Sequence, residues 1–466
     1  MGRRTPRRAN EVEEMDVADG RSLREATPRS SHAELDLPPD RDPVGVICRQ
    51  NESRLPDLLG IRTQRLAESP FSYFRGAAAQ MAVDLAAGVT TGPVVLSSGD
   101  AHVGNFGFFA SKERSLIFDL NDFDEAEFAP FEWDVKRLAA SAFLSAQVHG
   151  LGEEAGRRAA FAAVKGYQYR MGAQMAVTAL DRFYSIVDSD TLLAAISGEH
   201  HHTATKKAMK KARSRTGEKA LKKFATESSD SGLRIVDQPP LTRHLDDPSI
   251  DVEKLFAEYR RTARTDVAVL LEQFEVADSV LRVVGVGSVG TRCFLVLVTG
   301  PDGEPLLLQV KEAQESVVSA FGGQPKFSDH PEGQRITSEG ERVVRAQLVL
   351  QSVSDPFLGW TTFRGSGYYW RQFRDMKGSY DLAALTAPQL EAYSRLCGEV
   401  LARAHSQSPG ARLIAEYLGT SDTFATAVAV WAEKYAEVVT ADHGLLVEAA
   451  KSGEYPLLGD PGALDG

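Results

Sequence analysis

Hydrophobic positions predict two helical stretches with a small β-element between them. Apolar residues recur at helical spacing from Val44 to Leu85, and again from about Glu132 to Ile186, with few helix-breaking residues. Between these stretches, Val94–Leu96 predicts a short buried strand, and Phe106–Leu120 predicts a hairpin that turns at Ser111–Arg114. We therefore expect the first half of the folded region to be mainly helical.

A different pattern begins at Asp278, where the composition becomes typical of β-structure as far as Met376. A helical stretch from about Glu339 to Ser352 interrupts this region. The predicted strands are Leu281–Val284, Cys293–Val298, Leu306–Lys311 and Tyr368–Phe373.

The two ends of the chain have opposite character. The C-terminal part is expected to be helical, because Thr386 and Gln389 form a capping box and a last helix is predicted from about Asp422 to Val439. Residues 1–45 contain almost no large apolar side chains, so we expect a disordered tail there. Its paired arginines are not followed by the apolar segment that an export signal needs.

Composition and charge exclude several classes of protein. The 53 Lys and Arg residues against 64 Asp and Glu give a net charge of −11, which argues against general binding to nucleic acid or membrane surfaces. No apolar run approaches the roughly 18 residues that span a bilayer, so a membrane protein is not expected. The three cysteines lie far apart and are odd in number, which indicates no disulfide framework and favours a cytoplasmic location.

A basic segment lies between Lys206 and Lys223, where nine Lys or Arg residues accompany a single acid, Glu218. We expect a solvated helix face or a mobile loop. The alternative is a docking surface for an acidic or phosphorylated substrate.

The first group of residues that could carry chemistry flanks the predicted hairpin. Asp100 and Asn105 precede the hairpin, and Asp122 follows it. Because the hairpin returns the chain, Asp122 can face Asn105. A carboxylate and an amide oxygen suit Mg²⁺, which usually takes few protein ligands together with substrate phosphates. Asp100 would lie beside that ion as a hydrogen-bond acceptor for an incoming hydroxyl group.

The second group is a G-x-G-x-x-G segment that leads into a strand-like run. In a dinucleotide-binding unit such glycines open a helix, so the strand argues against an oxidoreductase of that kind. A glycine loop between strands, with a lysine at the end of the next strand, is the arrangement with which protein kinases hold ATP phosphates. The candidates for nucleotide binding are Gly285, Gly287, Ser288, Gly290 and Lys311.

These residues resemble known kinases. The segment from Asp100 to Asn105, Asp-Ala-His-Val-Gly-Asn, looks like the D-x-H-x-G-N catalytic loop of aminoglycoside and choline kinases. The resemblance implies that Asp122 is the metal-binding aspartate that follows this loop and that Asp134 supports the loop. His102 is expected to be structural.

The order of the motifs differs from that in those kinases, where the glycine loop precedes the catalytic loop. The chain therefore resembles a circularly permuted kinase-like fold, with the helix ending at Leu401–His405 similar to the one that normally runs into the catalytic loop. This requires Val95 and residues 405–410 to be neighbours in space. Trp370–Phe373 would form or adjoin the connection under the adenine, which makes Arg371 a further nucleotide-binding candidate.

The region from about residue 45 to 440 is similar to an uncharacterised bacterial family, domain of unknown function 2252. The matching stretches are Phe74–Gly76, Gly99–Gly107, Asp122–Ala140, Val284–Ala313, Asp355–Trp360 and Tyr369–Lys377. This family brings no established reaction, so the functional expectation depends on the kinase-like motifs. Arg75 is expected either to bind phosphate or to brace the acidic residues.

Together these features predict an α+β, two-lobed, protein-kinase-like fold that is circularly permuted. The expected divisions are a disordered tail at 1–45, a helical part at 46–245, a β-rich nucleotide-binding lobe at 246–377 and a second helical part at 378–466. The predicted reaction is ATP- and Mg²⁺-dependent transfer of a phosphoryl group to a hydroxyl. The acceptor is expected to be a small molecule, although a protein acceptor stays open. Asp100 would act on the acceptor, Asn105 and Asp122 would hold Mg²⁺, and Lys311 would grip the phosphates.

Several alternatives stay open from the sequence. Ser98-Gly99 replaces the histidine or arginine that kinases place before the catalytic aspartate, so a nucleotide-binding module without catalysis fits as well. Transfer of AMP in place of phosphate would use the same fold. A metal-dependent hydrolase would use Asp119, Asp122, Asp124 and Glu125. The sequence also does not decide which glutamate pairs with Lys311. The candidates are Glu312, Glu315, Glu339 and Glu341.

Overall fold

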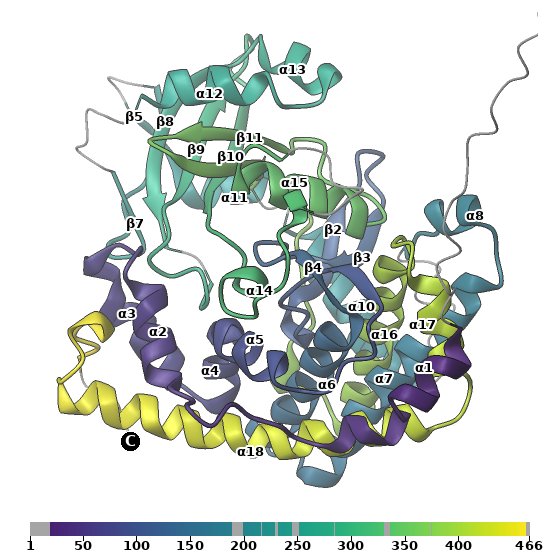
Figure 1. Ribbon diagram of the computed structural model, residues 1–466. Coiled ribbons are helices and arrows are strands. Elements are labelled where there is room, and N and C mark those ends of the chain that lie inside the picture. The colour runs from purple at the N-terminus through teal and green to yellow at the C-terminus, as the bar shows by residue number, and fades with distance from the viewer. Residues whose placement is uncertain are drawn as a thin grey trace, which may run out of the picture.

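The computed structural model describes residues 19–188, 199–215, 217–228, 232–244, 251–283, 285–329, 336–373 and 375–462. A strand-rich part lies at the top of Figure 1, and helices fill the larger lower part. The long helix α18 (Thr423–Ser452) runs along the base. The predicted α+β class is confirmed. In these residue ranges no helix combines the length and the apolar character needed to cross a membrane.

The upper part is built on a six-stranded antiparallel sheet with the strand order β11-β12-β10-β9-β8-β7. Its strands are β7 (Thr242–Arg243), β8 (Glu275–Arg282), β9 (Cys293–Thr299), β10 (Pro305–Ala313), β11 (Gly359–Phe363) and β12 (Ser366–Gln372). The sequence predicted β9, β10 and β12 closely. The predicted start of β8, Leu281, is six residues too late, because the polar residues Glu275, Asp278 and Ser279 interrupt the apolar pattern of the strand. Val284 lies outside the described residues.

Alternation along the strands gives the sheet two faces, each covered by helices. On one face Trp370 stacks on Tyr259 of α12 (Val252–Arg260), with ring centroids 4.5 Å apart. The opposite face packs on Phe224 of α11 (Gly217–Phe224). The predicted helix near residue 339 is α15 (Glu339–Leu350), which packs along β12 and β11.

Eight of the nine basic residues of the segment lie on α10 (Glu199–Arg213) and α11, and Arg215 lies between the two helices. The nine Lys and Arg side chains are all exposed, whereas Ala208, Met209 and Ala212 are buried. The solvated helix face expected from the sequence is therefore present on both helices.

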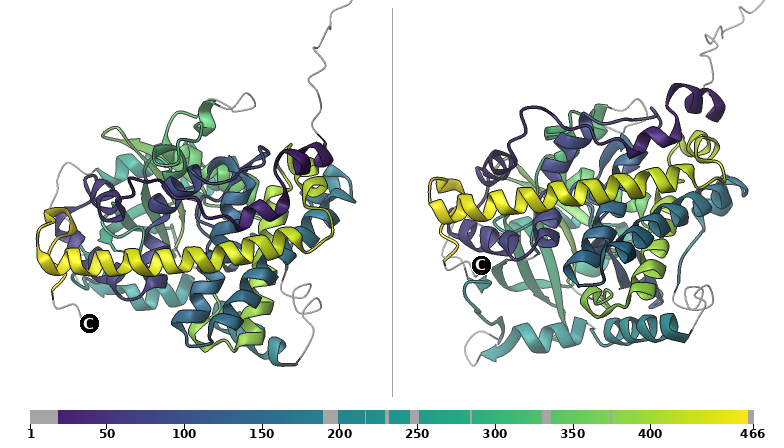
Figure 2. Two further views of the ribbon diagram at one scale, coloured as in Figure 1. Left: turned by 60° about the horizontal axis from the view of Figure 1, so that its bottom comes forward. Right: turned by 90° about the horizontal axis from the view of Figure 1, so that it is seen from below.

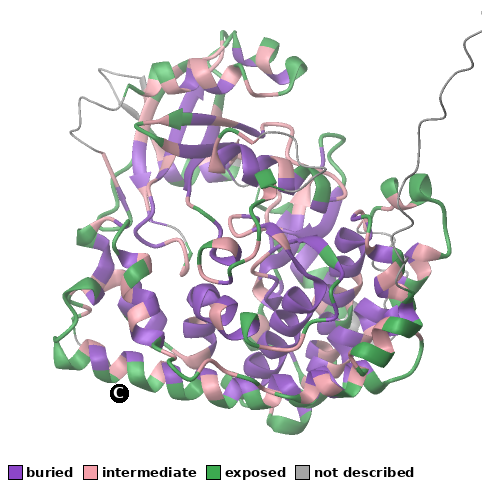
Figure 3. Ribbon diagram, in the orientation of Figure 1, coloured by how far each residue is buried: buried purple, intermediate pink, exposed green. Residues whose placement is uncertain are grey.

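The lower part is a helical core built from α6 (Phe131–Val148), α7 (Glu153–Met175) and α16 (Ala387–His405), where buried residues concentrate (Figure 3). The helical stretch predicted from residue 132 to 186 is divided because Gly150 and Gly152 adopt φ values of +71° and +86°. Glycine reaches this conformation without the strain that other residues incur. The capping box of Thr386 and Gln389 is present, and α18 extends to Ser452 rather than ending near residue 439.

The disordered tail predicted for residues 1–45 is wrong for residues 19–45. This segment forms the helix α1 (Gly20–Ala26), the 3₁₀ turn η1 (Arg29–Ala33) and the start of α2 (Pro43–Asn51). Arg29 Nη1 donates to the carbonyl of Leu418 at 2.6 Å, at the end of α17 (Ala411–Leu418). Polar side chains hold this segment by donating hydrogen bonds to carbonyls at the end of a helix, which have no partner within that helix. The low content of apolar side chains therefore did not indicate disorder here. Residues 1–18 lie outside the described ranges.

The short strands of the lower part match the predictions. β1 (Val94–Ser97) pairs with β4 (Glu127–Pro130), and the hairpin is formed by β2 (Phe106–Ala110) and β3 (Leu116–Leu120). The Leu96 N–H donates to Ser408 Oγ at 3.0 Å, so the segment after α16 lies beside β1. Val95 and residues 405–410 are thus neighbours, as the sequence argument required.

Candidate active site

The cleft between the sheet and the helical part contains two adjoining cavities. The larger has a volume of about 350 Å³ and is lined by Lys311 and Arg371. The smaller has a volume of about 100 Å³ and is lined by Arg75, Asp100 and Gly287. The residues that line both cavities are Asn105, Asp122, Gly285 and Ser288. Of the site residues predicted from the sequence, Gly290 alone lines neither cavity.

The loop that carries Asp100 is held by Asp134 of α6. The Asp134 carboxylate accepts the backbone N–H groups of Ser98 and Gly99, at 2.7 and 3.1 Å, and His405 Nε2 lies 3.1 Å from it. Gly99 has a φ of +73°, and a side chain there would collide with the Glu125 carbonyl. Asp134 therefore has the supporting position that the resemblance implied, and the Ser98-Gly99 replacement does not leave the loop without an anchor.

Asp100 lies half-buried between two basic side chains. Arg137 Nε donates to Asp100 Oδ1 at 2.5 Å, and His102 Nε2 lies 3.8 Å from Oδ2. Burial raises the pKa of Asp100 to about 7, although the Arg137 guanidinium opposes this shift. A carboxyl group with such a pKa is suited to accept a proton near neutral pH.

His102 has the structural position expected for it. Its ring is buried, and Nδ1 accepts the backbone N–H of Gly104 at 3.0 Å. Burial, together with the positive charges of Arg75 and Arg137, lowers the pKa of His102 well below its usual value. The ring therefore shapes the loop as a neutral group.

Asn105 and Asp122 are brought together by the hairpin. The backbone N–H of Asn121 donates to the Asn105 carbonyl at 2.9 Å, which fixes the start of the Asp122 segment beside the Asp100 loop. Asn105 Nδ2 donates to the carbonyl of Asp100 at 2.9 Å. Asp122 Oδ1 is buried and has no hydrogen-bond partner among the described residues. A buried carboxylate oxygen without a partner is costly, and a bound cation would remove that cost.

Lys311 pairs with Asp124. The ammonium group donates to Asp124 Oδ2, and Tyr369, the cross-strand neighbour of Lys311, donates its hydroxyl to Asp124 Oδ1 at 2.7 Å. Burial would raise the pKa of Asp124, but Lys311 and the Tyr369 hydroxyl hold it below its usual value. The ammonium is therefore fixed inside the cleft by a side chain from the opposite part of the molecule.

The four glutamates considered for Lys311 have other partners. Glu312 pairs with Arg292 at 3.2 Å, and Glu341 pairs with Arg345 at 2.7 Å. Glu339 pairs with Arg342 and Glu315 with Lys326, at 2.6 and 3.0 Å. Lys311 pairs instead with Asp124, which was predicted from the sequence only as a possible metal ligand of a hydrolase.

Arg371 lies on β12 opposite Gln309 of β10, on the same face as Lys311. Its Nε donates to Gln309 Oε1 at 2.9 Å, and its guanidinium lies 5.6 Å from the centre of the Tyr369 ring. The negative charges of Asp122 and Asp124 help to keep its pKa above the usual value despite burial. The larger cavity thus has two fixed cations on one wall.

The glycine-rich segment connects β8 to β9 and opens no helix, as predicted. Gly285 and Gly290 have φ values of +67° and +90°, which favour glycine. The carbonyls of this loop are bound by arginines of the N-terminal region: Arg54, which follows α2, donates to Val289, and two arginines of the next α-helix donate to Gly287 (Arg62) and Gly285 (Arg65). This attachment to the helical part was not predicted, because spacing within a glycine motif gives no sign of a distant partner.

Of the four acidic residues considered for a hydrolase, Asp122, Asp124 and Glu125 line the smaller cavity, and Asp119 lines neither cavity. Asp119 Oδ2 accepts the Ser352 N–H and hydroxyl at 2.8 and 2.7 Å. Asp124 is occupied by Lys311, and Glu125 accepts the Val317 N–H at 2.7 Å. Within the described ranges, no three or more His, Cys, Asp or Glu side chains form a group that could hold a metal ion.

Comparison with known proteins supports the family resemblance. Residues 54–449 match the model of a family described as "Uncharacterized protein conserved in bacteria (DUF2252)". No curated protein and no solved structure matched the chain. Because the family model covers most of the chain, including Asp100, Asp122 and Lys311, the protein belongs to the DUF2252 family of bacterial proteins.

Proposed function

We propose that this protein is a phosphotransferase that uses ATP and Mg²⁺ to phosphorylate a hydroxyl group of a small-molecule acceptor. The observation that carries the proposal is the convergence of Asp100, Asp122 and Lys311 on one cleft bordered by a glycine loop. A proton acceptor, a metal ligand and a phosphate-binding cation are the parts that phosphoryl transfer needs.

Asn105 and Asp122 would hold the Mg²⁺ ion. The unpartnered Asp122 Oδ1 fits a cation, and Asn105 uses its Nδ2 within the loop, so its Oδ1 is the end left for a ligand. Hard oxygen ligands of this kind suit Mg²⁺. When bound, Mg²⁺ would neutralise charge on the phosphate oxygens.

The nucleotide would occupy the larger cavity. Its volume of about 350 Å³ lies in the range of small-molecule sites. Lys311 and Arg371 offer positive charge to the phosphates from one wall, and Asp124 and Tyr369 hold the Lys311 ammonium in place. Preorganised charge of this kind lowers the cost of binding a polyanion.

The acceptor would lie beside Asp100 in the smaller cavity. As the acceptor oxygen forms a bond to the γ-phosphorus, the bond from that phosphorus to the bridging oxygen of ADP breaks and ADP leaves. The hydroxyl proton passes to the Asp100 carboxylate, whose pKa of about 7 suits this transfer. Arg137 orients the carboxylate through its 2.5 Å hydrogen bond.

The proposal extends to a circularly permuted kinase-like fold. Three features support it: the contact between Leu96 and Ser408, the support of the Asp100 loop by Asp134, and the glycine loop between antiparallel strands. In this view the chain enters the Asp100 loop from β1 rather than directly from α16.

Calorimetric titration with ATP, with and without Mg²⁺, tests the proposal. Wild type is expected to bind ATP in a Mg²⁺-dependent way, and Lys311→Met and Asp122→Asn should weaken binding at least tenfold. Lys136→Met is the matched control, since Lys136 is also a buried lysine but lies over Trp431, at 4.9 Å, and lines neither cavity. Absence of ATP binding by the wild type, with or without Mg²⁺, would disprove the proposal. Consumption of ATP with candidate acceptors then identifies the substrate.

A further inference from the structure

Arg75 is a half-buried basic side chain of the cleft that has no partner among the described residues; Arg215, which lines the larger cavity, shows none either but is exposed to solvent. It lies near the end of α4 (Pro70–Gly76) and lines the smaller cavity. It makes no hydrogen bond or ion pair with any described residue, and its Nε is buried. Leaving a guanidinium partly buried without a partner is costly, so a ligand that completes its hydrogen bonding would bind there favourably.

The neighbouring cations already have partners. Arg137 donates to Asp100 and to the Phe74 carbonyl, at 2.5 and 2.9 Å. Lys311 is bound to Asp124, and Arg371 to Gln309. If Arg75 served to brace the acidic residues, it would show an ion pair like that of Arg137. No such pair is present among the described residues.

The position of Arg75 indicates which anion it would meet. A Cβ atom on Gly104 of the Asp100 loop would lie 3.7 Å from Arg75 Nε, and a Cβ atom on Gly287 of the glycine loop would lie 3.5 Å from the Arg75 carbonyl. Arg75 therefore lies where the two loops meet. Asp100, on the acceptor side, lines the same cavity, whereas Lys311 lines the other.

We infer that Arg75 binds the terminal phosphoryl group of the bound nucleotide; the inference rests on the proposed function. A phosphoryl group that is to pass from the Lys311 side to the Asp100 side must lie between the two cavities, beside Asn105 and Asp122. Arg75 lines the smaller cavity, and its Nε lies near Gly104, which lines the larger one. A planar guanidinium donates paired N–H groups to phosphate oxygens, which gives geometric selectivity as well as charge.

This inference predicts a difference between ATP and ADP. Calorimetric titrations with Mg²⁺–ATP and Mg²⁺–ADP should be made on the full chain, for wild type, Arg75→Ala and Arg75→Lys. Arg75→Ala should weaken ATP binding about 10- to 100-fold, the usual effect of losing a charged hydrogen bond, and change ADP binding less than about threefold. Arg75→Lys, which keeps the charge, should lose less ATP affinity than Arg75→Ala. It also provides a second test if the alanine variant folds poorly.

Arg65→Ala is the matched control, because Arg65 touches the glycine loop through the Gly285 carbonyl but lines neither cavity. Any effect of this variant should be equal for ATP and ADP. The inference is overturned if Arg75→Ala weakens both nucleotides equally or neither. If neither nucleotide is affected, Arg75 would be expected to bind an anionic group of the acceptor instead. If wild type binds no ATP, the proposed function itself fails, which is a distinct result.

Discussion

Burial sets the chemistry of Asp100. Its side chain is 17% exposed, and removal from water raises its pKa to about 7 even though Arg137 favours the charged form. In the unfolded chain the same group ionises near its ordinary value of about 4. Between these values the native state holds a proton that the unfolded state has lost. Stability linked to this group is therefore full below about pH 4 and decreases as the pH rises towards 7.

A comparison of wild type with Asp100→Asn isolates this effect, because the variant keeps a side chain of similar shape that does not titrate. We expect wild type to lose about 2–3 kcal/mol of unfolding free energy relative to the variant between pH 5 and pH 8. Urea unfolding at the two pH values, with EDTA present to exclude metal binding, measures the difference. A difference that stays constant, or one that favours wild type at the higher pH, contradicts the assigned shift.

The sequence located the candidate site residues better than their partners. Asp100, Asn105, Asp122 and Lys311 could be selected because they stand in local motifs, and the structure brings all four to one cleft. The partner of Lys311 could not, since Asp124 lies 187 positions away and only the folded chain shows that it reaches the lysine. Arg75 had two possible roles in the sequence, and its lack of a partner became visible only with its neighbours in place.

Elements were predictable where their pattern was strong and local. β9 has a continuous apolar run, and polar residues interrupt β10 and the β2–β3 hairpin only briefly, so the apolar pattern located them. β4 and β11 were missed because the first has four residues and the second contains Gly359 and two threonines. The N-terminal segment was missed for another reason: Arg29 and its neighbours bind carbonyls of α17, a source of order that composition does not reveal.

The attachment of the glycine loop to the N-terminal helices sets its mobility. Arg54 donates to the Val289 carbonyl, and the Leu55 N–H donates to the Gly290 carbonyl at 2.8 Å. Leu58, Val283 and Val289 form a small apolar cluster beneath these contacts. The loop is therefore held at its C-terminal end by the helical part, which keeps it close to Asp100.

Arg54→Ala should loosen this loop. Loss of the Arg54 hydrogen bond, worth about 1 kcal/mol, predicts roughly fivefold faster amide hydrogen exchange in peptides that cover residues 285–291. Peptides from β9 and β10 should exchange as in wild type. Arg49→Ala serves as the control, because Arg49 lies on the preceding helix α2 and contacts the Phe321 ring, at 5.9 Å. Unchanged exchange in the 285–291 peptides would show that Arg54 does not hold the loop.

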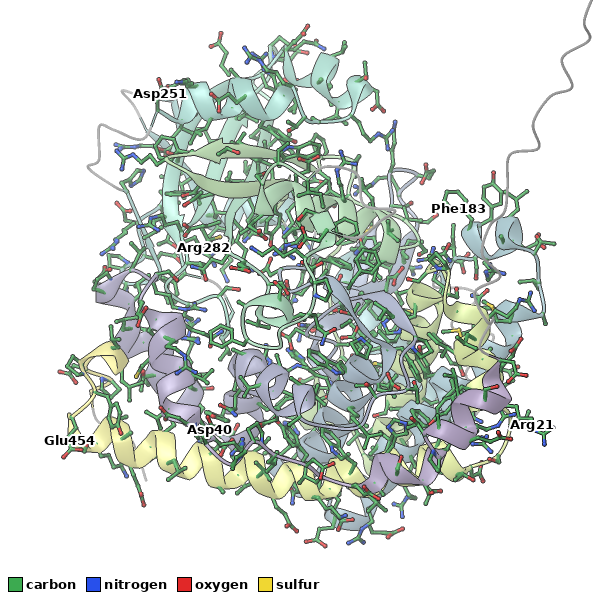
Figure 4. The ribbon with its side chains drawn as sticks, in the orientation of Figure 1. Arg21, Asp40, Phe183, Asp251, Arg282 and Glu454 are labelled. Carbon is green, nitrogen blue, oxygen red and sulfur yellow. The ribbon has the colours of Figure 1, made fainter. Side chains whose placement is uncertain are left out.

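The helical part of the molecule is joined along its base by α18. This helix contacts α2, α3 (Leu59–Ala67), α4, α6, α7 and η1. It therefore connects segments from the first half of the chain to the C-terminal part (Figure 2). Arg41 follows Asp40, which is labelled in Figure 4, and connects the N-terminal segment to α18. Its guanidinium donates to Asp84 of α5 (Ala78–Ala86) and to Asp442 of α18, each by two hydrogen bonds of 2.7 to 3.0 Å.

Arg41→Met should therefore destabilise the entire protein rather than one end of it. The substitution leaves two carboxylates, which are only 1% and 4% exposed, without their counter-ion. Breaking a buried ion pair in this way costs about 3–5 kcal/mol. Thermal and urea unfolding of the full chain should show this loss in one transition, because α18 contacts helices throughout the lower part. The triple variant Arg41→Met, Asp84→Asn, Asp442→Asn should recover much of it, since no unpaired charge then remains.

Arg21→Met provides the control for this substitution. Arg21 lies on the surface of α1 (Figure 4), where it pairs with Glu25 at 3.2 Å and is 81% exposed. Exposed pairs of this kind contribute about 0–1 kcal/mol, so the control should unfold almost as wild type does. Equal effects of the two substitutions would contradict a stabilising role for the Arg41 network. A separate early transition in Arg41→Met would show instead that α18 detaches alone, and that the two ends of the chain are joined more weakly than the geometry indicates.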